Sequence, residues 1–317
     1  MSNNKIVVIG ASGFVGAGIF EKLFQENHDI YGIGTKLNPW RIQQPLLERY
    51  FSTKNSDLNE ILNKLQPDVI INFAAHGAYS FQNSFETMVS SNLTLLEKLA
   101  LWAKSRDVLL IHAGSSSEYG TQSAGPLEDT VVRPNSLYAI TKLAGTQLLE
   151  FYSTLGLRST VLRLYSVYGP KEDSSRLIPA VMRGIVKSEW PDFTDPKISR
   201  DFIYLDDIAE LVTKIINSPS IKKDNFFEIY NVASGKMTTI NDLKNLLMSD
   251  FQMPNQQNDS YPKRGWDVEN WYGNISKIQR DFNWTPKTEL KSGLLKLKNW
   301  YLDSDNVKFL GKEFTEK

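Results

Sequence analysis

The chain has 317 residues, of which 41% are hydrophobic and 23% charged, so one large α/β domain or two lobes are expected. Lys+Arg and Asp+Glu are balanced at 36 each, which gives no global charge to attract nucleic acid or an anionic membrane. Without cysteine the chain has no disulfide, thiolate nucleophile or cysteine-based metal site, and we expect no metal. No apolar run approaches the ~20 residues that cross a bilayer, so we expect a cytoplasmic protein.

The first half of the chain alternates short β-branched runs with longer helical patterns. A helix follows the first glycines, because Val15, Ile19 and Leu23 recur every four residues, and another begins at the capping residue Asp57. Further strands and helices alternate, which is typical of a parallel sheet covered on both faces. Strands are predicted over 6–9, 28–33, 69–73, 108–113, 159–164 and 226–232, and further helices over 92–104, 138–155 and 240–248.

A glycine-rich segment, Gly10-Ala-Ser-Gly13-Phe-Val-Gly16, lies between the first strand and the first helix. Glycines let the backbone approach a pyrophosphate closely, and the helix N-terminus supplies N–H donors to it. A tight structural turn is the alternative. We expect this segment to bind a dinucleotide through Gly10, Ser12, Gly13, Phe14, Val15 and Gly16.

The end of the second strand bears on which dinucleotide binds. NAD sites place a carboxylate about 20 residues past the glycines, whereas NADP sites use a basic residue nearby. Here the strand ends in Gly34-Thr35-Lys36, with Arg41 close behind and no carboxylate. The pattern favours NADP(H) over NAD(H), with Thr35 and Lys36 at the cofactor; the alternative is that Lys36 is an ordinary surface lysine.

Tyr138 and Lys142 are one helical turn apart, so both project from one face of the predicted helix. A nearby ammonium stabilises a phenolate and brings a tyrosine toward a useful range for proton transfer. Tyr50 and Lys54 have the same spacing, but no serine-bearing strand end precedes them. Tyr138 instead follows a strand that ends in Gly114-Ser115-Ser116-Ser117, and strand C-termini are where α/β ligands bind.

With these motifs the sequence resembles the extended short-chain dehydrogenases/reductases of the NAD-dependent epimerase/dehydratase family, over essentially its whole length. The resemblance implies a Rossmann-type doubly wound parallel sheet over 1–168 plus about 198–233. A smaller, discontinuous α+β lobe over about 169–197 and 234–317 would bind a nucleotide-diphosphate sugar. The matching segments are 10–16, Asn72-Phe-Ala-Ala75, Ser115–Gly120, Tyr138-Ala-Ile-Thr-Lys142, Arg163–Pro170, Arg200–Asp207 and Arg264–Asp267.

The resemblance also implies roles for individual residues. Tyr138 would be the acid/base, Lys142 its tuner, and Ser115 the hydroxyl that polarises the sugar C4 oxygen. Ala74, Ala75 and Asn92 would line the cofactor pocket. The substrate would be held by Ser117, Ser166, Arg176, Arg200 and Arg264, although a surface salt bridge is an equal alternative for each arginine.

Departures from the family pattern bear on the reaction. Its 4,6-dehydratases carry an Asp-Glu pair after the Ser/Thr, whereas here Ser116 and Ser117 follow and Glu118 is displaced by one residue. Dehydration is therefore unexpected. The leading hypothesis is reduction of a 4-keto nucleotide sugar by NADPH, the close alternative is C4 epimerisation with tightly bound NAD, and a non-catalytic dinucleotide-binding protein is a third. A homodimer packed through 92–104 and 138–155 is also implied.

Overall fold

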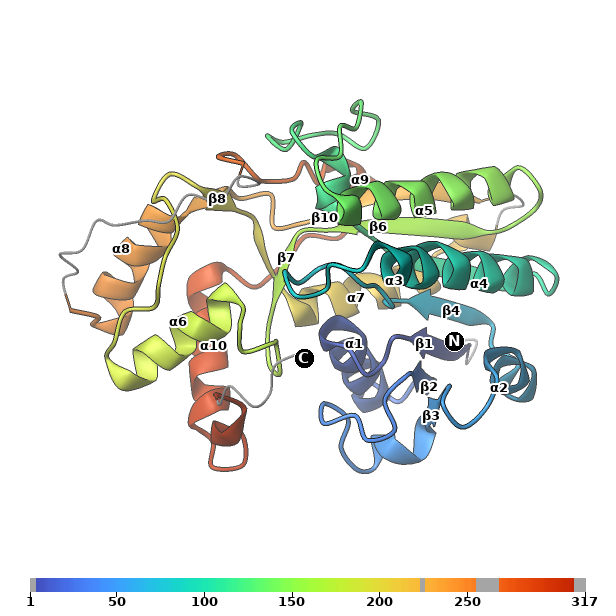
Figure 1. Ribbon diagram of the computed structural model, residues 1–317, viewed down its shortest axis with the longest axis horizontal. Helices are drawn as coiled ribbons and strands as arrows, with labels where there is room; N and C mark the ends of the chain where they lie inside the picture. Colours follow the sequence, from blue (N-terminus) through green and yellow to red (C-terminus); the bar gives the residue numbers. More distant parts are fainter. Residues whose placement is uncertain (1–3, 223–225, 255–267, 311–317) are drawn as a thin grey trace.

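The computed structural model describes residues 4–222, 226–254 and 268–310, and its centre is a seven-stranded sheet (Figure 1). The strand order is β10-β6-β5-β4-β1-β2-β3, and every neighbouring pair is parallel. The strands are β1 (Lys5–Ile9), β2 (Asp29–Gly34), β3 (Tyr50–Ser52), β4 (Val69–Asn72), β5 (Leu109–Ser115), β6 (Ser159–Leu164) and β10 (Phe227–Val232). The predicted Rossmann-type doubly wound sheet is confirmed.

The chain order reverses between β1 and β4. From β1 the chain moves outward to β2 and β3, and then returns to β4 on the other side of β1. Ligands of such sheets bind at the carboxyl ends of the strands beside this reversal. The glycine-rich segment after β1 and the loop after β4 therefore border the expected site.

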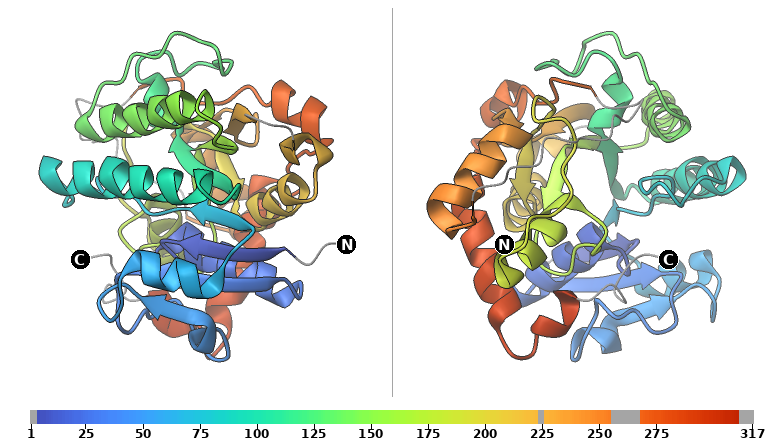
Figure 2. Two further views of the ribbon diagram at one scale, coloured as in Figure 1. Left: turned by 90° about the vertical axis from the view of Figure 1, so that its right-hand side faces the viewer. Right: turned by 60° about the vertical axis from the view of Figure 1, so that its left-hand side comes forward.

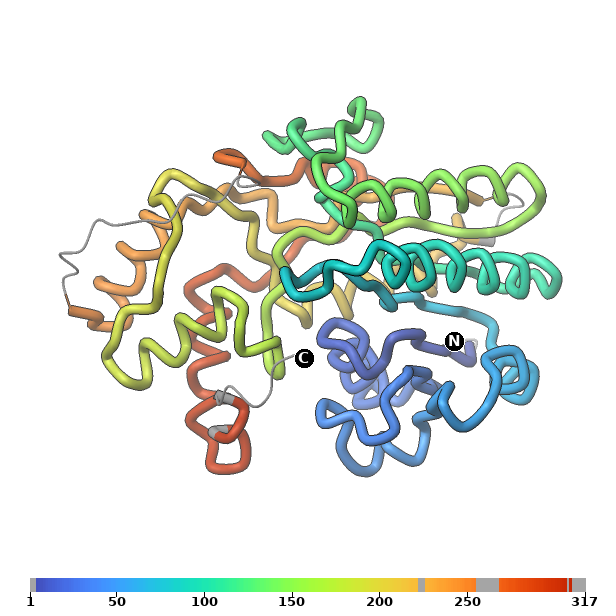
Figure 3. Tube along the Cα trace, in the orientation of Figure 1, coloured from blue at the N-terminus to red at the C-terminus, as the bar shows by residue number. Residues whose placement is uncertain are grey.

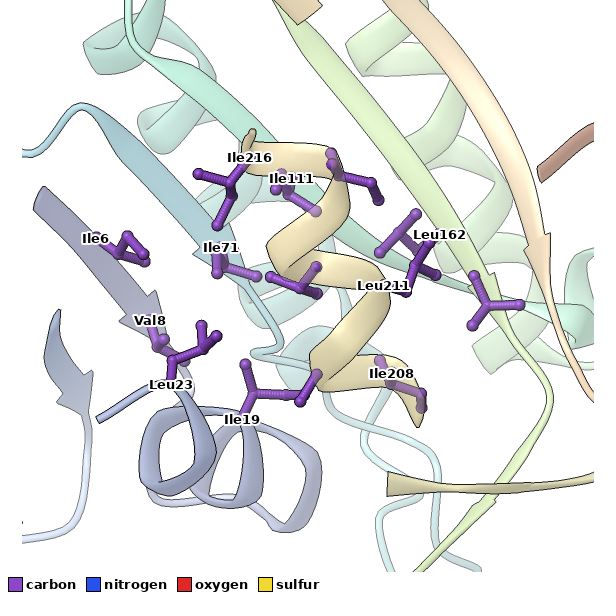
Figure 4. Close-up of a cluster of buried hydrophobic side chains, with 14 of the residues drawn as sticks. Ile6, Val8, Ile19, Leu23, Ile71, Ile111, Leu162, Ile208, Leu211 and Ile216 are labelled. Atoms are coloured by element: carbon purple, nitrogen blue, oxygen red, sulfur yellow. The ribbon is translucent and has the colours of Figure 1, made fainter. Parts of the chain in front are cut away.

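Helices cover both faces of the sheet, which explains why its strands are apolar on both sides. On β1 the side chains alternate: Ile6 and Val8 belong to one buried cluster, and Val7 and Ile9 to the other. One face carries α1 (Phe14–Gln25), α7 (Leu205–Ile216) and α9 (Ser276–Phe282), and Figure 4 shows the side chains that meet there. The other carries α2 (Leu58–Leu65), α4 (Leu95–Lys104) and α5 (Leu137–Ser153); Figure 2 shows α4 and α5 opposite α7 and α9.

A third buried cluster forms the core of the second lobe. It joins apolar side chains of α6 (Leu177–Lys187), α8 (Ile240–Phe251) and α10 (Leu290–Leu302) with Tyr168 and Phe202. Two short strand pairs complete the fold: β7 (Ser166–Tyr168) with β9 (Phe202–Tyr204), and β8 (Ser199–Arg200) with β11 (Thr238–Thr239). The tube in Figure 3 shows α6 beside α10, although they are far apart in the sequence. The exact domain boundaries stay a prediction.

Two local features differ from the expected elements. Tyr50 begins the edge strand β3, so Tyr50 and Lys54 do not share a helical face. The helix predicted over 92–104 is α4 from Leu95, preceded by a π-helical turn at Ser90–Thr94 and by α3 (Phe85–Val89). π-Turns often mark functional sites, and this one contains Asn92.

No helix among the described residues is long and apolar enough to span a membrane. The predicted homodimer stays a prediction. Large apolar side chains are exposed on the helices concerned, including Leu101 on α4 and Phe151 on α5.

Truncating Leu211 tests the core between the sheet and α7. Leu211 is fully buried (Figure 4), so Leu211→Ala should lower the free energy of unfolding by about 2–5 kcal/mol through lost burial and a cavity. Urea unfolding followed by circular dichroism measures the loss. Leu295→Ala, on the exposed face of α10, is the matched control and should change stability by no more than about 0.5 kcal/mol. Equal effects would contradict the packing described.

Candidate active site

The glycine-rich segment turns so tightly that two of its glycines have no room for a side chain. Gly10 has a positive φ of 78°, and a Cβ built on it would lie 2.6 Å from the amide nitrogen of Ala74. A Cβ on Gly16 would lie 2.3 Å from the carbonyl oxygen of Gly10. Glycine at position 10 therefore lets the ends of β1 and β4 come together, and glycine at position 16 lets α1 start directly against the turn.

Helix α1 begins directly after this turn. Its N-cap is Gly13, which has no side chain to occupy the first N–H groups of the helix. Those donors and the helix dipole favour an anion at this end. The residues present fit a dinucleotide pyrophosphate, with Ser12, Phe14 and Val15 half-buried around the turn.

A tyrosine hydroxyl lies beside the end of β2, where a carboxylate is missing. A Cβ built on Gly34 would lie 2.7 Å from both the Tyr50 hydroxyl and the Ser12 Oγ. The Tyr50 hydroxyl donates to the carbonyl of Lys36 at 2.8 Å. Thr35 and Lys36 have exposed side chains at this end. A neutral phenol thus stands next to the place from which an acidic side chain would extend.

Arg41 lies behind the glycine turn rather than in solvent. It is buried, and its guanidinium donates to the carbonyls of Lys171 at 2.9 Å and Ser12 at 3.4 Å. Its plane also lies over the Trp40 ring, 4.1 Å from the centroid. Arg41 therefore supports the turn through backbone contacts.

The three predicted catalytic residues come together at the end of β5. Ser115 is the last residue of β5, and its side chain lies close enough to the hydroxyl of Tyr138, in the first turn of α5, to favour the phenolate. Lys142, one turn further along α5, is buried and donates from Nζ to the carbonyl of Ala113 at 2.6 Å. Ser136 caps α5 by accepting from the amide of Ala139, which fixes where the helix starts.

Burial changes the proton affinities of both groups on α5. Desolvation raises the pKa of Tyr138, and it is opposed by the Ser115 hydrogen bond and the positive charge of Arg176. Desolvation also lowers the pKa of Lys142 to about 8, although the carboxylate of Glu118 favours its ammonium form. The amine of Lys142 therefore loses its proton more easily than an exposed lysine does.

Glu118 is fully buried and does not face the substrate side of Ser115. Its carboxylate accepts from the Ser115 amide at 2.8 Å, the Thr146 hydroxyl at 2.9 Å and the Arg163 Nε at 2.9 Å. Glu118 lies in the 3₁₀ turn Ser116–Tyr119, so the alternation of a strand, from which we argued its direction, does not apply there. The turn folds the carboxylate back onto the N-cap in a capping box.

Asn92 connects the loop after β4 to α5. Its Oδ1 accepts from the His76 amide at 2.8 Å, and its Nδ2 donates to the His76 carbonyl and the Thr141 hydroxyl, each at 2.9 Å. Ala74 and Ala75 precede this contact, and the Ala74 amide donates to Asn72 Oδ1 at 3.0 Å. Asn92 thus shapes the loop predicted to line the cofactor pocket.

The predicted substrate residues are spread over both lobes. Ser117 is two residues after Ser115 and is half-buried, and Ser166 begins β7 with its amide donating to the Asp201 carbonyl. Arg176, at the start of α6, donates to the Ala78 carbonyl at 3.0 Å and acts electrostatically on Tyr138. Arg200 donates to the Ser199 carbonyl at 2.7 Å and lies over the Trp271 ring. Arg264 lies outside the described residues.

Two polar residues at the site are not among the site residues that the sequence predicts. For Tyr50 the available signal is the missing carboxylate at the end of the neighbouring strand β2. His112 is fully buried on β5, between Asn72 and Lys142. A histidine in an otherwise apolar strand, two residues before the serine-rich end, was its signal.

A doubly wound sheet with a glycine turn after β1 and a Ser/Tyr/Lys set beside it defines an extended short-chain dehydrogenase/reductase. The profile of the NAD dependent epimerase/dehydratase family matches residues 6–233, and the chain belongs to that family. It is an enzyme of this NAD-dependent type.

The relatives cover nearly the whole chain. Protein CapI of Staphylococcus aureus is 26% identical over 94% of this chain and 98% of that protein. UDP-glucuronate 4-epimerase 5 of Arabidopsis thaliana is 30% identical over 94% of this chain and 75% of the relative. UDP-glucuronic acid 4-epimerase from Bacillus cereus, solved with UDP-glucuronic acid and NAD, shares the fold with a TM-score of 0.79 at 23% identity, covering 96% of this chain and 99% of that one.

Removing Arg163 tests the buried ion pair beneath Ser115. Arg163→Met leaves the Glu118 carboxylate uncompensated, so the free energy of unfolding should fall by about 3–5 kcal/mol. The double variant Glu118→Gln with Arg163→Met removes both charges and should recover part of that loss. Urea unfolding of the two single variants and the double variant measures the coupling. Additive effects would show that the pair is not coupled as its geometry requires.

Proposed function

We propose that the protein is a nucleotide-sugar C4 epimerase. The observation that carries this proposal is that Glu118 is held in a buried ion pair with Arg163, whereas the Ser115 side chain lies close enough to the Tyr138 hydroxyl to favour the phenolate. Elimination of water from C5–C6 needs further acid and base groups beside the serine, and Ser116 and Ser117 occupy those positions. Epimerisation at C4 needs one group that removes a proton and later returns it.

Tyr138 suits that single proton-handling role. With Tyr138 and Lys142 together short of one proton, the phenol oxygen takes the proton of the sugar C4 hydroxyl as that carbon is oxidised. Ser115 donates to the same sugar oxygen and holds it next to the phenol. The 4-keto sugar then rotates in the site so that its other face is presented. Tyr138 returns the proton to the oxygen, and the product has the opposite configuration at C4.

A nicotinamide dinucleotide, when bound, supplies the chemistry that removes and restores the hydride at C4. The residues that would hold it are the glycine turn, the N-terminus of α1 and the loop at Ala74 and Ala75. Asn92 keeps that loop against α5 through its bonds to His76 and Thr141. Lys142 would reach the nicotinamide ribose from the same helix as Tyr138.

Relatives support a UDP-sugar substrate. Several are named as UDP-glucuronate 4-epimerases, at 27–30% identity over 94–95% of this chain. We propose that the diphosphate is bound by Arg176 and Arg200, with Ser117 and Ser166 near the sugar. Arg264 is proposed for the same role from its motif alone.

Reduction of a 4-keto nucleotide sugar is the second candidate, and the adenosine end of the site favours it. Consumable NADPH suits net reduction, and nothing acidic extends from Gly34 to repel a 2′-phosphate. We propose that the Tyr50 hydroxyl bonds the adenosine ribose and that Lys36 pairs with a 2′-phosphate. The site would then bind NADP(H) at least as tightly as NAD(H).

A substrate assay with a matched tyrosine control tests the function. Purified protein is incubated with UDP-glucuronate, UDP-glucose and their C4 epimers, and the products are separated by chromatography. Epimerisation should interconvert a pair with no net change in absorbance at 340 nm. Tyr138→Phe should lower the rate by about 10²–10⁴ because the proton carrier is lost, whereas Tyr152→Phe, on the same helix, should leave it unchanged. Stoichiometric NADPH loss with a 4-keto sugar would instead establish the reductase.

Binding measurements test the cofactor proposal without turnover. Lys36→Ala should weaken NADP⁺ binding by about tenfold through loss of one charge-assisted contact, and leave NAD⁺ binding unchanged. Gly34→Asp combined with Tyr50→Phe should reverse the preference, because the loss of the Tyr50 hydroxyl and a rotation of the Ser12 side chain make room for a carboxylate that repels a 2′-phosphate. Calorimetric Kd values check both, with Lys98→Ala on α4 as the control. Much tighter binding of NAD⁺ than of NADP⁺ to the unmodified protein would contradict the proposal.

A further inference from the structure

His112 is a buried histidine that the mechanism above does not use. It lies on β5, three residues before Ser115, and has no exposed surface. Its Nδ1 is 3.1 Å from the Nδ2 of Asn72, and its Nε2 is 3.3 Å from the Nζ of Lys142. The ring therefore connects the end of β4 to the catalytic helix α5.

A backbone amide determines which groups donate and which accept in this chain of hydrogen bonds. The amide of Ala74 is a donor only, and its partner at 3.0 Å is Asn72 Oδ1. The NH₂ group of Asn72 must then face His112, so Nδ1 of the ring accepts. A neutral imidazole carries one N–H, which leaves the hydrogen on Nε2.

The Nε2–H of His112 faces the Nζ of Lys142, which can accept a hydrogen bond only when it is a neutral amine. An ammonium has three N–H donors and no lone pair, whereas a neutral amine has one lone pair. Lys142 already donates to the Ala113 carbonyl at 2.6 Å, which either form allows. All hydrogen bonds from Ala74 to Lys142 are therefore satisfied together only when Nζ is neutral.

On this geometry we propose that His112 is a positioning residue that donates its Nε2–H to Lys142 and favours the neutral amine in the resting site. The inference deepens the proposed function and rests on it only for its effect on rate. The pair Tyr138–Lys142 accepts the proton of a sugar hydroxyl only when it is short of one proton. The neutral amine then takes the proton of the phenol, and the ammonium formed stabilises the phenolate that accepts the sugar proton. His112 stabilises the pair with one proton removed, so the pair loses its proton at lower pH than it would without this bond.

Other groups around Tyr138 and Lys142 also influence the protonation of the two side chains, in both directions. Desolvation lowers the pKa of Lys142 and so acts in the same direction. Glu118, from the 3₁₀ turn, favours the ammonium but is paired with Arg163 of β6. Arg176, at the start of α6, favours the phenolate of Tyr138. Burial holds the pKa of His112 well below its usual range, and the positive charge of Lys142 lowers it further whenever that amine is protonated, so the ring stays neutral.

The ring tautomer can be measured without turnover. The chain has three histidines, so nitrogen-15 NMR of histidine-labelled protein is simple to assign, with His112→Phe and His28→Asn as assignment variants. We expect His112 to be protonated at Nε2 only, with no titration between pH 6 and 9. A proton on Nδ1, or an imidazolium in this range, would overturn the proposal whatever the protein catalyses.

Reversing the hydrogen-bond chain tests the effect on Lys142. In Asn72→Asp the carboxylate accepts from both Ala74 and Nδ1–H, which moves the lone pair of the ring to Nε2, where it accepts from an ammonium. The Nδ1–H tautomer should appear, and the acidic limb of kcat/KM should move up by about one pH unit.

His112→Phe, which removes the donor but keeps an aromatic ring, should move the limb in the same direction. His28→Asn, at a partly exposed position just before β2 and away from Lys142, should leave the limb in place. Limbs unchanged in both site variants would refute the tuning role, even if epimerisation itself is confirmed. If no sugar nucleotide turns over, the tautomers of the unmodified and Asn72→Asp proteins decide the proposal alone.

Discussion

The carboxylate of Glu118 is the contact on which the geometry of the site depends. It accepts hydrogen bonds from the end of β5 at Ser115, from Thr146 on α5 and from Arg163 on β6. β5 carries Ser115, α5 carries Tyr138 and Lys142, and β6 is the strand next to β5. A charged group at full burial is tolerated here because each of its oxygens has partners and a guanidinium balances its charge. The ion pair and its hydrogen bonds therefore tie the position of Ser115 to the middle of α5 and to β6.

Much of this arrangement was predictable from the sequence because it depends on local patterns. Continuous apolar runs predict strands buried on both faces. The glycine-rich turn was recognisable from its spacing between a strand and a helix, although the contact that requires Gly10 is with Ala74 in the loop after β4. The i, i+4 spacing of Tyr138 and Lys142 puts both on one face of a helix wherever that helix lies. Features that depend on a single helix or turn can therefore be predicted from the sequence without knowledge of the fold.

The remainder depends on contacts between distant segments. β3 has three residues at the edge of the sheet, too few for a pattern, and only its pairing with β2 brings Tyr50 to Gly34. The π-turn at Asn92 accompanies side-chain bonds to His76, sixteen residues earlier, and to Thr141, forty-nine residues later. The direction of Glu118 was argued from strand alternation, whereas a 3₁₀ turn and the distant Arg163 determine it. No pattern within a single segment of the sequence identifies these distant contact partners.

In the proposed site, both ends of the dinucleotide meet neutral groups where a charge is the simpler choice. At the proposed adenosine end a phenol lies beside the glycine from which a carboxylate would extend, and beneath Lys142 the proposed donor is a neutral imidazole where a carboxylate could accept. A carboxylate at either place would act strongly, because charges interact over longer distances in a poorly solvated site. It would select one dinucleotide at the first position and fix the ammonium of Lys142 at the second. Neutral hydrogen bonds instead orient their partners while leaving the proton of Lys142 easy to remove. A reversible proton carrier benefits from that, because the same pair must accept and return one proton in each turnover.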